Sequence, residues 1–290
     1  MKFIKNNFHL LNVDAVKLDT DWNFNNVISP YYRLYYIAGG EGHINSLSGK
    51  TQLITGNLYL IPSYTLCDLH CNDYMEQYFI QFFEDTPEGI SIFGHYREIM
   101  SVKADPLDMI SFERIIAINP GRGINRSFDP KVYEKDIFYK EYTKLNELQS
   151  MSVRFETQGI ILALLSRFMR SKNFLMFNQT AIPLAVTAAI RYIQMNISKS
   201  LKVSLLASIA NLSVNYFSRI FHQSTGKSPA SYVLEKRIER AQYLVTTTSM
   251  QYKEIAELAG FENQQYFSRI FKNMTGLSPK AYRKQSQGWC

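Results

Sequence analysis

The sequence predicts an α+β protein, in which a β-rich part is followed by a helical part. Short aromatic and apolar segments separated by Gly, Asn, Ser and Asp fill residues 31–83, and from Pro106 onward apolar residues recur with a period near 3.6. A length of 290 residues favours two domains rather than one. We place these domains at residues 1–170 and 183–290, joined by a linker at 171–182 that lacks periodicity.

The β-rich part is expected to contain several short strands. They are separated by the turn residues GGEG (39–42), SGK (48–50), TGN (55–57) and ND (72–73). This spacing is typical of a meander, a sandwich or a barrel. The expected strands are 31–38, 43–47, 51–54, 58–62, 66–71 and 74–83.

The rest of the chain is expected to be helical. In the segment 151–170, Phe155, Ile160, Leu164, Leu165 and Phe168 give a broad apolar stripe. Such a stripe either packs on the β domain or joins two copies of the chain, and it is our reason for predicting a homodimer formed through the first 180 residues. The expected helices are 107–118, 131–147, 151–170, 183–197, 203–210, 214–224, 229–246, 252–258, 263–273 and 279–285.

One short unit occurs twice near the C-terminus. YFSRIF spans residues 216–221 and again 266–271, and the segments TGKSP and TGLSP follow at the same offset. Written as a helix, each copy places its two phenylalanines and the isoleucine between them on one face, which we expect to be buried. Met274 is expected to extend this buried stripe in the second copy.

The residues around each copy indicate a helix-turn-helix unit. A short helix containing a small residue, Ala207 or Ala256, precedes each copy, and a small residue there lets a second helix cross closely. Asn211 and Gly260 stand where the turn needs a left-handed residue. Each copy is followed by Ser-Pro, an N-cap serine with proline at the first helical position. Short helix, turn and second helix with a polar outer face is the helix-turn-helix design.

The alternative explanation is a helical-hairpin repeat in which YFSRIF serves packing alone. Two copies are too few for a solenoid, which normally needs three or more. Packing explains the phenylalanines, but it explains neither the polar outer face nor the charge. Residues 183–290 hold 14 Lys and Arg against five Glu and no Asp, a net charge of +9, whereas residues 1–182 carry −2. This asymmetry favours a polyanionic partner such as nucleic acid over a plain solvated surface.

The outward face of each copy carries amide, hydroxyl and cationic groups. In the first copy this face has Asn215, Ser218, Arg219 and His222, and in the second Gln265, Ser268, Arg269 and Lys272. Arg can form hydrogen bonds with guanine, and Asn or Gln with adenine, in a major groove. Lys272 is a candidate for a phosphate contact.

On these motifs residues 183–286 resemble the AraC family of bacterial transcription regulators, above all through "AGFENQQYFSRIFK". The resemblance implies two helix-turn-helix units, joined by a long helix, that enter adjacent major-groove segments. The first turn departs from the family pattern, because Asn211 replaces a commoner glycine. Carried over by position, the base-reading candidates are Val214, Asn215, Ser218 and Arg219 in the first unit, and Asn263, Gln264, Gln265, Ser268 and Arg269 in the second.

The N-terminal part resembles the cupin-like sensor domain of the same family. The strand–turn rhythm of residues 36–65 and the step GNLYLIP carry this resemblance. It implies a cupin-like β-barrel with trailing helices, and the helices at 131–170 are similar to the pair that often dimerises such proteins. The resemblance implies no particular ligand.

Taken together, the sequence predicts a transcription regulator whose partner is double-stranded DNA. A small-molecule effector and RNA polymerase are further partners that this class admits, while no cofactor, catalytic residue or membrane span is expected. Three cysteines make no disulfide framework, and the N-terminus is a poor signal peptide, so we expect the cytoplasm.

The competing hypothesis is a cupin-type metalloenzyme with a DNA-binding appendage. It would depend on Cys67, His70 and Cys71. In a strand, positions 67 and 71 share a face and position 70 points to the other, so we predict no metal site there.

Overall fold

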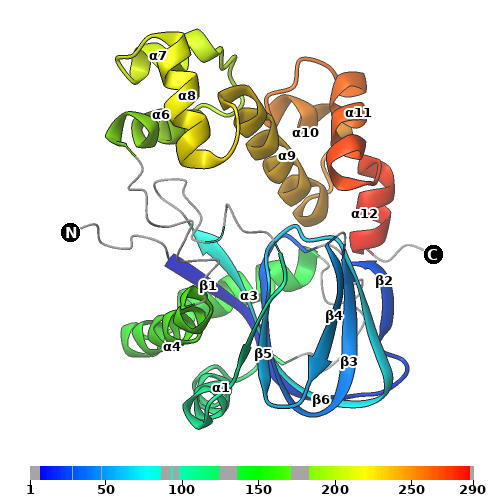
Figure 1. Ribbon diagram of the computed structural model, residues 1–290. Coiled ribbons are helices and arrows are strands. Elements are labelled where there is room, and N and C mark those ends of the chain that lie inside the picture. The colour runs from blue at the N-terminus through cyan, green and yellow to red at the C-terminus, as the bar shows by residue number, and fades with distance from the viewer. Residues whose placement is uncertain are drawn as a thin grey trace. The chain divides into compact units, whose positions relative to one another are not determined.

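The computed structural model describes residues 7–27, 29–46, 48–85, 93, 98–123, 136–170 and 183–287. It divides into two compact units, one built on a β-sheet and one entirely helical (Figure 1). The predicted linker at 171–182 lies outside the described residues. None of the described helices is long and apolar enough to cross a membrane.

The first unit is built on an antiparallel sheet that has seven strands among the described residues. Its central strands are the two longest, β3 (Tyr32–Ser46) and β6 (Cys67–Asp85). The order is β1-β6-β3-β5-β7, with β2 also pairing with β6 and β4 with β3. The other strands are β1 (Asn7–Leu18), β2 (Asn23–Val27), β4 (Gly49–Ile54), β5 (Asn57–Ile61) and β7 (Met100–Lys103).

The sheet packs apolar side chains on its inner face. These include Tyr35, Ile44, Leu69, Met75 and Phe79, each at most 2% exposed. Within the described residues the pairing path has two ends that do not meet, so the closed, cupin-like barrel that the sequence predicted is not confirmed. What stands is an antiparallel sheet followed by helices.

Two predicted turns are wrong, for one physical reason. Residues 39–42 and 72–73 lie inside β3 and β6, and the register between these strands shifts between Ile37 and Gly42. A Cβ on Gly40 would meet the Tyr74 carbonyl oxygen at 2.0 Å, and its φ is +69°. The Gly-rich and Asn-Asp segments therefore form a bulge in a continuous strand pair rather than two reversals. Strands β1, β2 and β7 were not predicted.

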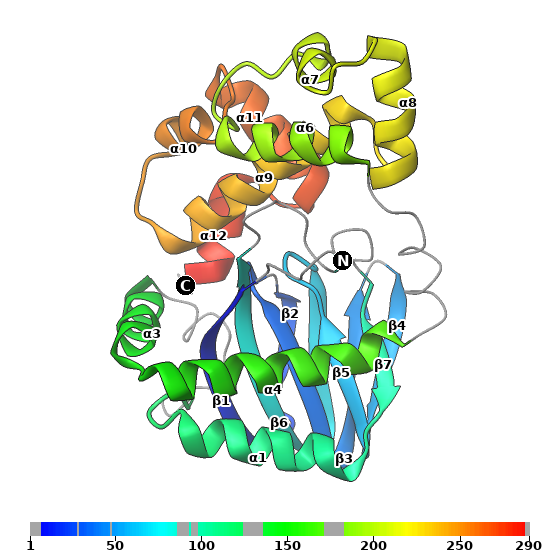
Figure 2. The same cartoon turned by 90° about the vertical axis from the view of Figure 1, so that its left-hand side faces the viewer.

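Among its described residues the first unit also has three helices: α1 (Pro106–Ile118), α3 (Asp136–Leu148) and α4 (Met151–Met169). Figure 2 shows α1 and α4 lying across one side of the sheet. In α4, Leu164, Leu165 and Phe168 are buried as predicted, together with Ile161. Phe155 is not part of this face, because it is 69% exposed.

Buried polar groups tie β1 to the segment after α1. The Arg122 guanidinium donates to the carbonyls of Leu10 and Leu11, 3.1 Å each, and to Asn146 Oδ1 at 2.8 Å. These carbonyls belong to the part of β1 where its register with β6 shifts. Burial lowers the pKa of Arg122 to about 10, so the side chain still carries its charge at neutral pH.

The second unit contains two three-helix groups and the helix that joins them (Figure 1). The first group is α6 (Leu184–Met195), α7 (Val203–Ile209) and α8 (Val214–Thr225). The long helix α9 (Pro229–Thr247) follows it. The second group is α10 (Tyr252–Leu258), α11 (Gln264–Thr275) and α12 (Pro279–Gln287). All the helices predicted beyond residue 182 are present, with ends within about two residues.

We predict that Arg122→Met destabilises the protein by about 2–4 kcal/mol. The methionine fills similar space but leaves the Leu11 carbonyl and Asn146 Oδ1 without their donor. The measurement is the free energy of unfolding in urea. The control is Arg114→Met, which removes an exposed ion pair to Glu156 between α1 and α4. If both variants unfold at the same urea concentration as the original protein, Arg122 has no such role.

Candidate nucleic-acid interface

The turn between α7 and α8 has the same backbone geometry as the turn between α10 and α11. Leu212 N donates to Ala207 O at 3.0 Å, and Phe261 N donates to Ala256 O at 2.8 Å. The residue before each donor is left-handed, with φ +53° at Asn211 and +86° at Gly260. The predicted turn residues are confirmed, and so is the burial of the small alanines, each 1% exposed.

The helices α8 and α11 each bury two phenylalanines. Phe217 and Phe221 in α8, and Phe267 and Phe271 in α11, are all 0% exposed. The isoleucine between them is half-buried in both helices. Met274 was predicted to be buried and is 45% exposed, because the buried face of the last turn is formed by Phe271 and Thr275 instead.

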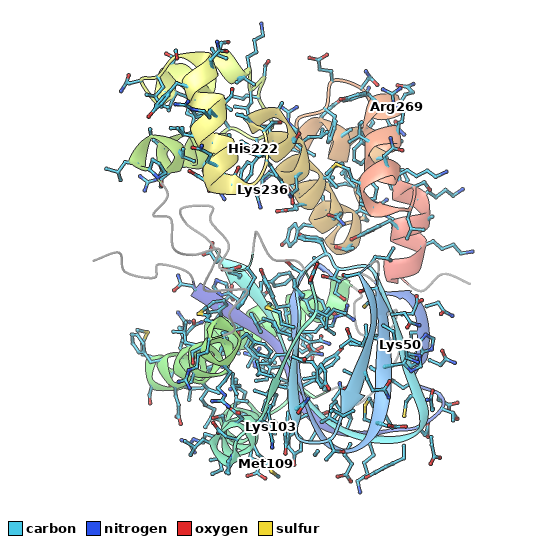
Figure 3. The ribbon with its side chains drawn as sticks, in the orientation of Figure 1. Lys50, Lys103, Met109, His222, Lys236 and Arg269 are labelled. Carbon is cyan, nitrogen blue, oxygen red and sulfur yellow. The ribbon has the colours of Figure 1, made fainter. Side chains whose placement is uncertain are left out.

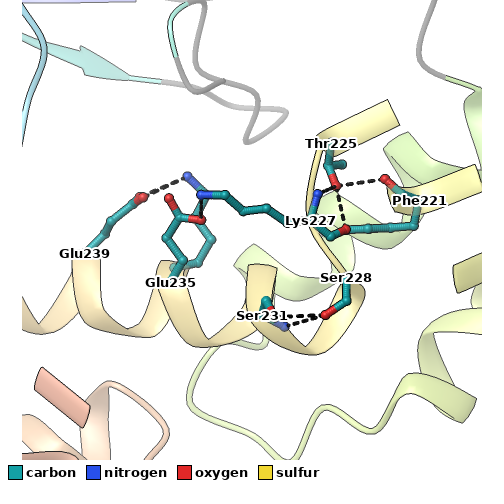
Figure 4. Close-up of polar contacts among 8 residues, drawn as sticks. Phe221, Thr225, Lys227, Ser228, Ser231, Glu235 and Glu239 are labelled. Carbon is teal, nitrogen blue, oxygen red and sulfur yellow. Dashed lines mark hydrogen bonds and ion pairs between the residues drawn. The ribbon is translucent and has the colours of Figure 1, made fainter. Parts of the chain in front are cut away.

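Each of these helices also ends in the same way. The Thr225 hydroxyl lies 2.7 Å from Phe221 O and 3.1 Å from Lys227 O, and a left-handed glycine follows it. Ser228 then caps α9 by accepting from Ser231 N at 3.2 Å, as predicted (Figure 4). The same contacts recur fifty residues later at Thr275 and Ser278. The two copies are therefore one structural unit used twice.

The predicted site residues are gathered on the outer faces of α8 and α11. All are exposed except Ser218 and Ser268, which are half-buried. Figure 3 shows His222 on α8 and Arg269 on α11. His222 occupies in the first copy the place that Lys272 takes in the second. The exposed or half-buried candidates are Val214, Asn215, Ser218 and Arg219, then Asn263, Gln264, Gln265, Ser268, Arg269 and Lys272.

Sequence analysis missed a feature of these faces. The Arg219 guanidinium carbon lies 5.1 Å from the centre of the Tyr216 ring, and Arg269 lies 5.5 Å from Tyr266. Both tyrosines are more than 40% exposed. A cation stacked on an aromatic face is attracted to it and loses fewer conformations on binding. The spacing Tyr-x-x-Arg on a helix was the signal for this contact.

Asn263 differs from the other candidates because its side chain caps a helix. Its Oδ1 accepts from Tyr266 N at 2.7 Å and so caps α11. Ser213, in the same place before α8, makes no side-chain cap. The amide nitrogen of Asn263 remains for an outside partner.

The residues of the competing metal hypothesis lie apart. Cys67 and Cys71 are buried in the inner face of the sheet, at 2% and 4% exposure. The half-buried His70 instead has Nδ1 2.5 Å from Asn23 Oδ1, and its ring stacks on His43 with centroids 4.7 Å apart. Among the described residues no three His, Cys, Asp or Glu converge as metal ligands.

A family described as "Helix-turn-helix domain" matches residues 206–285 of this chain. A relative along the whole length is the Msm operon regulatory protein of Streptococcus mutans, 26% identical over 289 residues that cover 99% of this chain and 96% of the relative. The probable transcriptional regulator LumQ of Photobacterium leiognathi is 33% identical over 73 residues, covering 25% of this chain and 29% of LumQ.

Among solved structures, apo ToxT of Vibrio cholerae has a TM-score of 0.55 at 13% identity, covering 97% of this chain and 96% of ToxT. ToxT with a bound unsaturated fatty acid has a TM-score of 0.51 at 14% identity, covering 98% and 96%. At these identities the likeness concerns the fold, and it extends over both units.

We predict that Asn263→Ala lowers the free energy of unfolding by about 1 kcal/mol, because the Tyr266 amide loses its cap. Ser213→Ala is the matched control and should change stability little, since Ser213 caps nothing. Thermal unfolding of the two variants side by side makes the comparison. Equal losses would show that the Asn263 cap contributes nothing beyond helix propensity.

Proposed function

We propose, from the premise that residues 206–285 are a helix-turn-helix domain of the AraC type, that this chain is a sequence-specific DNA-binding transcription regulator. The observation that carries the proposal is the duplicated face on α8 and α11. Each helix hides its two phenylalanines and exposes amide, hydroxyl and guanidinium groups at one-turn spacing. The relative that matches the chain over its whole length is named as a regulatory protein.

The charge of the helical unit supports the same partner. A net charge of +9 over residues 183–290 attracts the phosphate backbone, and cations bound to phosphates displace counterions from the DNA. Phosphate contacts would give affinity, and the outer faces of α8 and α11 would give sequence preference. RNA polymerase remains a predicted partner, to which we assign no residue. Because the DNA of a bacterium lies in its cytoplasm, we also propose that the protein acts there.

Within these faces we assign the roles as follows. Arg219 and Arg269 contact guanine edges, and the tyrosine stacked on each holds the guanidinium extended. The residues one turn earlier differ between the copies, with Val214 and Asn215 against Gln264 and Gln265. The two half-sites should therefore differ in sequence. Ser218 and Ser268 lie on the same faces, Asn263 offers its amide nitrogen, and Lys272 is assigned to phosphate.

We assign the sheet unit to sensing, with a small-molecule effector as its ligand. The support is the likeness of fold to ToxT along both units, and one ToxT structure holds an unsaturated fatty acid. Identity of 14% is too low to transfer that ligand. The cupin-like architecture belongs to this proposal as well.

We also assign dimerisation to α1 and α4. These helices are joined by the ion pair of Arg114 with Glu156 and expose apolar side chains. On α4, Met151, Phe155 and Leu162 are 36–69% exposed and lie within about 40° of one another around the helix. On α1, Leu107 and Ile110 are 70% and 56% exposed. Apolar residues collected on two neighbouring helices are typical of an interface between copies.

The proposed function is tested by selecting bound sequences from a random DNA pool with the full chain. Arg219→Ala and Arg269→Ala should each weaken binding by about 1–3 kcal/mol and relax the preference at one base pair, in different half-sites. This follows because each arginine faces its own stretch of groove. Relaxation of the same base pair by both variants would contradict two separate recognition helices, and a pool without enrichment would contradict sequence-specific binding.

Lys272→Ala provides the matched control in that assay. If Lys272 contacts phosphate, it should weaken all sequences alike and reduce the slope of log affinity against log salt by about one. The unmodified chain should show a slope of several negative units. A flat salt dependence is inconsistent with nucleic acid as the partner.

The dimer is tested by Phe155→Ser. Removing the most exposed aromatic residue of α4 should shift the chain from dimer to monomer in sedimentation at micromolar concentration. Ile54→Ser, at an exposed apolar position on β4, is the control and should leave the dimer intact. A monomeric unmodified chain, or equal behaviour of both variants, counts against the assignment.

A further inference from the structure

The two turns of the duplicated unit have unequal surroundings. In the first turn the left-handed residue, Asn211, is exposed to solvent. In the second turn, a Cβ on Gly260 would lie 2.3 Å from the carbonyl oxygen of Ile197 and 2.8 Å from Arg237 Nε. Ile197 follows α6, so it belongs to the first helix-turn-helix group. The backbone of the second turn thus packs directly on the first group, which a side chain at position 260 would prevent.

Arg237, in the middle of α9, lies at this junction. Its Nε donates to Ile197 O at 3.2 Å and its terminal nitrogen donates to Lys199 O at 2.7 Å. The guanidinium carbon also stands 6.0 Å from the centre of the Phe261 ring, in the second group. Burial lowers the pKa of Arg237, while the nearby Glu262 acts in the opposite direction. One planar side chain therefore contacts both groups at once.

Arg283 makes hydrogen bonds in the second helix-turn-helix group that correspond to those of Arg237 in the first. From α12 it donates to Val245 O at 3.2 Å, in the last turn of α9, and to Met250 O at 2.7 Å, in the segment before α10. Arg237 does the same for the segment before α7. Hydrogen bonds of this kind attach a helix-turn-helix motif to the helix that follows it. The contacts to Gly260 and Phe261 go beyond that role, because they join the first helix-turn-helix group to the second.

A second contact reinforces the junction from the same helix. Arg240 Nε donates to Leu258 O at 2.9 Å, at the end of α10. The turn of the second helix-turn-helix group is thereby held by α9 on one side and by the Ile197 carbonyl on the other. Rotation of this group about α9 would break all of these contacts.

Resting on the proposed function, we propose that the Gly260–Ile197 contact and the Arg237 side chain set the spacing between the two half-sites. They hold α8 and α11 at one separation and one rotation. Arg237 and Gly260 are then positioning residues for specificity, although they face away from DNA bases. Each base pair inserted between the half-sites moves the second one by about 3.4 Å and about 35°. A rigid junction cannot follow both changes.

The experiment measures affinity of the full chain for duplexes with none, one or two base pairs inserted between the selected half-sites. The unmodified chain should bind the one-pair insertion at least about tenfold more weakly than the parent duplex. Gly260→Asn keeps the left-handed turn, as Asn211 does in the first unit, but forces a side chain into the junction. Its affinities for the parent and inserted duplexes should differ by less than about threefold.

Gly226→Asn is the matched control. Gly226 is also left-handed, with φ +70°, but nothing lies within 4 Å of its missing Cβ, so its spacing ratio should equal that of the unmodified chain. Arg237→Lys keeps the charge but removes the planar fork that reaches both carbonyls, and should relax the ratio partway even if Gly260→Asn folds poorly. Unchanged ratios in both Gly260→Asn and Arg237→Lys overturn the proposal. A chain that binds no selected duplex overturns the proposed function instead.

Discussion

The aromatic core inside each helix-turn-helix group is the constraint on which the rest of the helical unit depends. In the first group Phe217 packs on Phe221, and Phe221 packs edge-on against Tyr232, with centroids 5.3 Å apart in both pairs. The equivalent pairs in the second group are 5.4 Å and 5.1 Å apart. Truncating a buried phenylalanine typically costs about 3–5 kcal/mol, so this core fixes which face of α8 and of α11 points outward.

With the outward faces fixed in the same way, the two copies differ in the residues around the recognition helices. Asn263 caps its helix while Ser213 does not, and Gly260 packs on the first group while Asn211 meets solvent. The chain uses one fold twice but does not surround it in the same way. A duplicated unit with unequal surroundings suits recognition of two different half-sites in a defined arrangement.

The sheet unit is stabilised differently, because it buries polar groups along with its apolar core. Arg122 and Asn146 satisfy the carbonyls of an irregular part of β1. The bulge at Gly40 bends the β3–β6 pair without interrupting it. Such irregular positions give up regular backbone pairing, and the side chains or close approaches around them make up for it.

The sequence by itself determined the features that depend on neighbours along the chain. Helix periodicity, the capping serines, the left-handed turn residues and the outward polar stripe all follow from contacts within a few residues, so they could be predicted, down to Asn211 and Gly260. The tertiary structure alone decided the rest. The GGEG segment looks like a turn until its partner strand is known, and Phe155 looks like core until the register of α4 on the sheet is known. The Ile197–Gly260 contact joins residues 63 positions apart, and no local pattern announces a pairing that is settled by how whole helices pack.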